Sequence, residues 1–91
     1  MKSALGFIEL QNLCDAICAL DTMLKSATVT LETWEKRLGG RLVTIIISGS
    51  VSSVTAAIES AEQSYDIRAS LVIPVPHPET IKMVKKSIDK M

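Results

Sequence analysis

One apolar run, LVTIII at residues 42–47, constrains the fold of this 91-residue chain more than any other segment. Isoleucine, valine and threonine branch at Cβ, and such residues favour extended structure. A half-buried strand alternates apolar and polar residues, whereas this run is apolar at nearly every position. Strands of that kind are covered or paired on most sides. We therefore expect residues 42–47 to form a central strand of a sheet.

Three other segments have the patterns of strands that would complete this sheet. Residues 4–10 (ALGFIEL) form a short apolar run between polar residues, and residues 69–74 (ASLVIP) end at a proline. Residues 28–36 (TVTLETWEK) alternate, which predicts a strand with one buried face. The alternation assigns Val29 and Leu31 to one face of the sheet, and Trp34, with Thr30 and Glu32, to the other.

Three segments have the spacing of amphipathic helices. Asn12 can cap the first helix and Ser50 the second, and the third begins at Pro78. Apolar residues step by three and four along each segment. They are Leu13, Ile17, Leu20 and Leu24 in the first, Val51, Val54, Ile58, Ala61 and Tyr65 in the second, and Ile81, Val84 and Ile88 in the third. The other face of the third helix is nearly all lysine, so we expect it at the surface.

The order of these elements, β-α-β-β-α-β with a short C-terminal helix, predicts an α+β fold of the ferredoxin-like plan, in a single domain over residues 1–91. Right-handed crossovers put the first and third strands side by side in the middle of an antiparallel sheet, with both helices on one face. The opposite face then carries Trp34, and no later segment is large enough to hide it. An exposed apolar sheet face favours self-association.

Composition excludes several classes of function. Lysine plus arginine and aspartate plus glutamate number ten each, and the three aromatic residues offer little for stacking on bases, so nucleic-acid binding is not expected. The N-terminus lacks the pattern of a signal peptide, and the longest apolar run is too short to span a membrane. We expect a cytoplasmic protein that does not bind a membrane.

The residues capable of chemistry form no recognisable catalytic or metal-binding set. Cys14 and Cys18 are four residues apart on the first predicted helix, a spacing poor for a disulfide, and the single histidine, His77, is distant in the sequence. We expect both cysteines to be core thiols, with no metal and no cofactor. Glu9 and Asp21 have no evident catalytic partner, so we expect no enzymatic activity.

Two other functional classes use the same fold. Small acyl-phosphate hydrolases hold phosphate with an N-terminal arginine, but the first arginine here is Arg37. Regulatory domains that bind a small ligand and pair through their sheets remain the alternative hypothesis, since fold alone does not fix function. The turn RLGGR also has an ordinary interpretation, because any tight hairpin favours glycine, and Arg37 and Arg41 could pair with Glu35 or Glu32 on a solvated turn.

Four segments, in order and at matching spacing, resemble one family. These are ALGFIEL, DAICALDTMLKSATVTL, EKRLGGRLVTIIISGSV and LVIPVPH, which together extend from residue 4 to residue 77. They are similar to the first strand, first helix, pore turn with its strand, and closing segment of bacterial microcompartment shell proteins of the single-domain, hexamer-forming type. The chain is identified on these motifs as a member of that family.

The resemblance implies a structural role. Such proteins form flat cyclic hexamers that tile the facets of a shell around encapsulated enzymes, together with other shell proteins. The turn Arg37, Leu38, Gly39, Gly40 and Arg41 would then line a pore at the sixfold axis. Arginines at its mouth and glycine backbone N–H groups would favour small anionic metabolites.

The resemblance also implies a set of residues at the hexamer edge, namely Lys25, Val75 and His77. Val75 stands where the family commonly has an arginine that joins neighbouring hexamers. This difference predicts weaker tiling than usual and dependence on a partner shell protein. The pore turn holds one residue more than the usual pattern, and the second helix and its exit loop are shorter.

Overall fold

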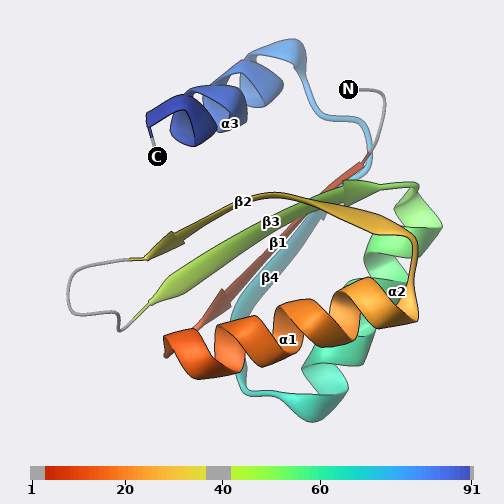
Figure 1. Ribbon diagram of the computed structural model, residues 1–91. Coiled ribbons are helices and arrows are strands. Elements are labelled where there is room, and N and C mark those ends of the chain that lie inside the picture. Colours follow the sequence, from red (N-terminus) through yellow and green to blue (C-terminus); the bar gives the residue numbers. More distant parts are fainter. Residues whose placement is uncertain (1–3, 37–41, 91) are drawn as a thin grey trace.

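The computed structural model, shown in Figure 1, describes residues 4–36 and 42–90. These residues include four strands and three helices. In chain order they are β1 (Ala4–Leu10), α1 (Leu13–Ser26), β2 (Val29–Lys36), β3 (Val43–Gly49), α2 (Val51–Ser64), β4 (Ile67–Ile73) and α3 (Pro78–Lys90). This order is the one that the sequence patterns predict.

The four strands form one antiparallel sheet in the order β2-β3-β1-β4. The apolar strand β3 is paired on both sides, which confirms the central position expected for residues 42–47. Its partner in the middle is β1, with Ile8 opposite Ile45 and Leu10 opposite Val43. The sheet therefore has β2 and β4 as its two edge strands.

Helices α1 and α2 cover one face of the sheet, as Figure 1 shows. The main core lies between these layers and includes Ile8, Ile45, Met23, Val54 and Ile58, each at most 4% exposed. The two predicted caps are confirmed. The side-chain oxygen of Asn12 accepts a hydrogen bond from the Asp15 N–H at 2.8 Å, and that of Ser50 accepts one from the Ser53 N–H at 3.1 Å.

The buried stripe of α1 differs from the predicted one. Its fully buried residues are Ala16, Ala19 and Met23, whereas Ile17 is 58% exposed and Leu24 is 44% exposed. Leu13 and Leu20 pack at the border of the core. Small alanine side chains let α1 approach the sheet and α2 closely, so the helix is rotated toward them and the larger residues lie at the margin.

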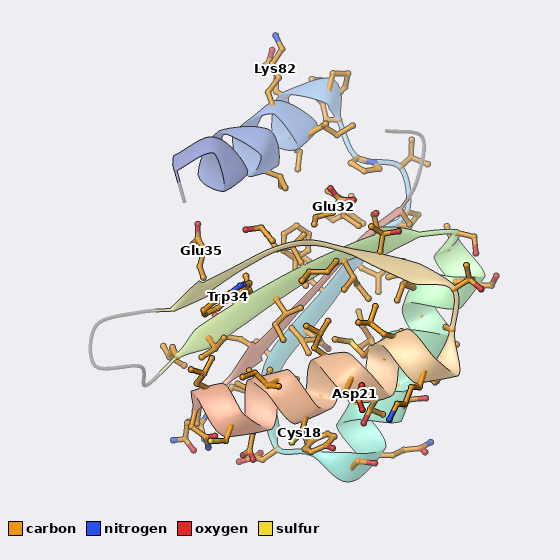
Figure 2. All side chains as sticks on the ribbon, viewed as in Figure 1. Cys18, Asp21, Glu32, Trp34, Glu35 and Lys82 are labelled. Atoms are coloured by element: carbon orange, nitrogen blue, oxygen red, sulfur yellow. The ribbon has the colours of Figure 1, made fainter. Side chains whose placement is uncertain are left out.

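The face of Trp34 was wrongly assigned by simple alternation. The register of β2 against β3 shifts between Leu31 and Thr33, so that Leu31 pairs with Ile47 and Thr33 with the next residue, Ile46. Glu32 is the extra residue of a β-bulge, which reverses the alternation beyond it. Trp34 consequently faces α1, and Figure 2 shows it on the α1 side of β2, with Glu32 and Glu35 on the other side.

The expectation that no later segment covers the second face was also wrong. Helix α3 lies across that face above β2, as Figure 1 shows. Val84 is 5% exposed and packs with Leu5 and Ile46 in a second, smaller core. The exposed side of α3 includes Met83, which is 67% exposed, in agreement with the expected surface position of this helix.

Candidate functional site

The predicted pore residues Arg37, Leu38, Gly39, Gly40 and Arg41 lie outside the described residues. The positions on either side of them are described. Lys36 ends β2 and pairs with Val43 at the start of β3, so the segment connects two hydrogen-bonded neighbours of the sheet. Figure 1 shows the paired ends of β2 and β3 at one edge of the molecule. In the sequence, Arg37 directly follows Lys36 and Arg41 directly precedes Leu42.

The two acidic residues considered as partners of these arginines have different surroundings. Glu32 is partly buried, and its carboxylate accepts a hydrogen bond of 2.6 Å from the Ser48 hydroxyl. Glu35 is exposed. Both side chains lie on the face of β2 turned toward α3 (Figure 2). Glu32 therefore has a role within the sheet, in holding the bulge of β2 against β3.

Lys25, a predicted edge residue, is exposed on the last turn of α1. Its ammonium group lies 2.8 Å from the Asp21 carboxylate one turn earlier, and the two side chains are 76% and 61% exposed. The hydrogen bond and then the charge of Asp21 raise the pKa of Lys25 above its ordinary value of 10.5. Lys25 is thus positively charged at neutral pH, and any contact at an edge would compete with Asp21 for it.

The other two predicted edge residues lie in the segment between β4 and α3. Val75 is 87% exposed, which is unusual for an aliphatic side chain. The His77 Nδ1 accepts a hydrogen bond of 3.0 Å from the Glu79 N–H, and its carbonyl accepts from the Thr80 and Ile81 N–H groups. His77 is therefore the cap of α3. Pro78, the first residue of α3, marked the start of this helix in the sequence. The cap at His77 was not expected, because histidine is an uncommon capping residue.

Sequence reasoning missed an apolar hollow beside α1. Its volume is about 210 Å³, and it is lined by Ile17 and Leu20 of α1 and by Leu31, Trp34 and Ile45 of the sheet. Trp34 is 39% exposed in this position. The bulge in β2 brings Trp34 here, and a break in alternation cannot be recognised from the residues alone. The hollow lies near the β2 edge of the sheet, on the face that α1 covers.

A second hollow, also of about 210 Å³, lies over β1 and β4. Phe7, Ala69 and Leu71 form its apolar part, and Glu9 and Thr44 contribute polar groups. Leu71 is 55% exposed. The molecule therefore presents large apolar side chains near both edges of its sheet, beside β2 and beside β4.

Both cysteines lie at the surface, so their assignment to the core was wrong. Cys14 and Cys18 are exposed, because the buried side of α1 consists of Ala16, Ala19 and Met23. Among residues 4–36 and 42–90, no group of three or more histidine, cysteine, aspartate or glutamate side chains is placed to hold a metal ion. The helices in the same part of the chain lack the length and apolar character needed to cross a membrane.

Comparison with protein families identifies the domain. The family model described as the BMC domain matches residues 4–76, about four fifths of the chain. The chain belongs to the BMC domain family. The matched region extends from the first residue of β1 to the segment before α3, so it includes residues 37–41, Lys25 and Val75.

Relatives of this BMC domain are shell proteins. The chain is 40% identical over 93 residues to the bacterial microcompartment shell protein PduA of Salmonella typhimurium strain LT2, covering 98% of both chains. It is 39% identical over 83 residues to the carboxysome shell protein CcmK2 of Synechocystis, covering 85% of this chain and 80% of that one. The similarity to the first of these spans nearly the full length of both proteins.

The fold of the BMC domain is also found in a solved structure. The crystal structure of a microcompartments protein from Desulfitobacterium hafniense superimposes with a TM-score of 0.80 at 22% sequence identity. The match covers 94% of this chain and 48% of that one, so this chain spans about half of the solved protein. At this identity the likeness establishes the fold alone.

Proposed function

We propose that this protein is a structural subunit of a bacterial microcompartment shell, formed by one domain over residues 1–91. The observation that carries the proposal is the 40% identity to a microcompartment shell protein over 98% of both chains. Because the alignment extends over nearly all of both chains, the surfaces available for assembly are expected to be similar. The strand order, with β1 and β3 central, supports the ferredoxin-like plan on which this proposal places the subunit.

The subunits assemble into a cyclic hexamer under this proposal. A ring requires each subunit to contact its neighbours through two different surfaces. The exposed apolar residues beside β2, such as Trp34 and Ile17, and those beside β4, such as Leu71, offer two such surfaces. The segment 37–41 of each subunit lines the pore at the axis of the ring, where six copies gather two arginines each.

The pore favours small anions such as carboxylates and phosphates. Arg37 and Arg41 supply positive charge, and the backbone N–H groups of Gly39 and Gly40 bind anionic oxygens without a side chain. Repeated charge around a narrow opening raises the local concentration of anions. The hexamers tile with other shell proteins around encapsulated enzymes in the bacterial cell, through an edge that includes Lys25, Val75 and His77. The subunit itself has no catalytic activity and needs no cofactor.

The alternative, a regulatory domain that binds a small ligand, has less support. Pockets for such ligands enclose roughly 300–1,000 Å³ and bring several polar groups together. The hollow beside α1 measures about 210 Å³, and all of its lining residues are apolar. Its surroundings are better suited to an apolar side chain of another subunit than to an amino acid or a nucleotide.

Electron microscopy of the concentrated protein tests the proposed tiling. We expect sheets or tubes with a hexagonal lattice, and Lys25→Ala should reduce their amount while leaving the size of the soluble assembly unchanged. Lys82→Ala is the matched control, because Lys82 is similarly exposed and pairs with Glu79 on its own helix at 3.6 Å. Equal sheet formation by both variants and the parent protein would show that Lys25 has no role at the edge.

A further inference from the structure

Two exposed thiols lie four residues apart on α1 and have no part in the proposed shell role. They belong to Cys14 and Cys18. Figure 2 shows Cys18 on the side of α1 turned away from the sheet. Residues at this spacing are neighbours on one helix face, with about 5–6 Å between their Cβ atoms. The two sulfur atoms therefore share a single patch of the surface.

The separation of the thiols fits a bridging ion better than a disulfide. A disulfide requires Cβ atoms roughly 3.5–4.5 Å apart, closer than a regular helix holds them. Two metal–sulfur bonds of about 2.3 Å, in a line through one ion, would place the sulfur atoms roughly 4.6 Å apart. With Cβ atoms about 5–6 Å apart, we expect side-chain rotation at Cys14 and Cys18 to reach that distance without a change in the helix.

The number of available ligands selects the kind of ion. Structural zinc takes four ligands, and the described residues include no group of three or more suitable side chains. Thiolates are soft ligands that favour ions such as Cu(I). Cu(I) is stable with two thiolates in a linear arrangement, which needs no third protein ligand.

The carboxylates nearest to the cysteines in the sequence are already engaged. The Asp15 side chain accepts a hydrogen bond of 3.1 Å from the Asn12 amide, and Asp21 pairs with Lys25 at 2.8 Å. Both are hard oxygen ligands that suit a soft ion poorly. Their negative charge nevertheless favours a cation nearby over an anion. The sulfur atoms of Cys14 and Cys18 are therefore the proposed ligands for a soft cation on this surface.

We propose that Cys14 and Cys18 form a two-thiolate site on the outer face of α1, which binds one soft monovalent cation of the Cu(I) class per chain. Binding converts two thiols into two thiolates and releases two protons, and no electron is transferred. The proposal rests on the geometry of α1 and is independent of the shell role.

An anaerobic titration of the full chain with Cu(I), in competition with a chromophoric Cu(I) chelator, tests the site. We expect one Cu(I) per chain and an ultraviolet charge-transfer band of copper–thiolate bonds. Since each single variant loses chelation, Cys14→Ser and Cys18→Ser should each weaken binding about 100-fold or more. Binding by either variant as tight as that of the parent chain would overturn the proposal.

A matched control keeps two exposed thiols on α1 but separates them. The double variant Cys18→Ser, Leu24→Cys places thiols at positions 14 and 24, about 15 Å apart along the helix axis. Leu24 is 44% exposed, so this exchange disturbs little of the core. We expect this variant to bind Cu(I) as weakly as the single variants. Binding equal to the parent, or a copper-dependent increase in assembly size that shows bridging between chains, would also overturn the proposal.

Discussion

The Ser48 hydroxyl donates a hydrogen bond of 2.6 Å to the carboxylate of Glu32, and it thereby joins β3 to the bulge in β2. Ser48 is 6% exposed and Glu32 is partly buried, on the face of the sheet that α3 covers in part. The bulge at Glu32 reverses the alternation of β2, so that Trp34 faces α1. A polar contact on one face of the sheet thus supports the position of an apolar side chain on the other.

Ser48→Ala should destabilise the protein by about 1–3 kcal/mol, because the partly buried Glu32 carboxylate loses its hydrogen-bond donor. Urea denaturation, followed by the fluorescence of Trp34, measures the change, since the chain has one tryptophan. Ser64→Ala, at an exposed position of α2, is the control and should change stability by at most about 0.5 kcal/mol. Equal effects of the two substitutions would contradict a role of the Ser48 bond in stability.

Gly6→Ala should destabilise the fold through a clash between β1 and α2. A Cβ at Gly6 would lie 2.5 Å from Val54 Cγ1 and 2.9 Å from Ile58 Cδ1, in the middle of the core. Overpacking of this kind costs about 1–3 kcal/mol. Gly49→Ala should destabilise less, because its Cβ would lie 3.1 Å from Thr28 O and 3.3 Å from Val29 Cγ1. A midpoint of urea denaturation for Gly6→Ala equal to that of the parent protein would refute the close approach at Gly6.

The ion pair of Lys25 and Asp21 should contribute stability that is constant through neutral pH. The pKa of Lys25 is raised, so the contribution is fully present below 10.5 and is lost as pH rises through the folded-state pKa. Titration of the Lys25 side chain by NMR should give a pKa above 10.5 in the parent chain. Asp21→Asn removes the charge, and the pKa should fall toward 10.5. An identical pKa in both proteins would exclude Asp21 as its cause.

Replacement of Arg37 and Arg41, the proposed pore arginines, should reduce the proposed preference for anions. We expect the double variant Arg37→Ala, Arg41→Ala to lose positive charge at the pore of each ring and to pass small carboxylates less readily relative to cations of the same size. Flux of both kinds of ion through assembled sheets or single pores is the measurement. Salt should weaken the preference of the parent protein, because charges are screened over about 10 Å at ~0.1 M ionic strength. Unchanged selectivity in the variant would identify both arginines as ordinary surface charges.

The fold was largely predictable because its strongest signals are local. The apolar run 42–47 identified the central strand, and Asn12 and Ser50 identified two helix starts through their capping side chains. The orientation of Trp34 was not predictable, since a bulge leaves no sequence pattern distinct from regular alternation. The role of α3 was missed for a different reason. Ile81, Val84 and Ile88 form only a thin apolar stripe in a lysine-rich helix, and Val84 alone is buried among the described side chains of α3.

The surface residues were less predictable than the core. Apolar spacing marked Leu13, Ile17, Leu20 and Leu24 as the buried stripe of α1, but alanines and Met23 take that place. Alanine contributes little to a hydrophobic pattern and yet packs closely, so the rotation of α1 and the exposure of Cys14 and Cys18 followed from tertiary packing. The pore and edge residues came from family resemblance, and their roles stay predictions.

Native mass spectrometry of the purified chain tests the central claim most directly. If the protein is a ring-forming shell subunit, the dominant species should contain six copies of the 9.9 kDa chain. Because the proposed contacts bury the apolar surfaces beside both sheet edges, the hexamer should persist on dilution. Monomers and dimers alone over a wide range of concentrations would contradict the account.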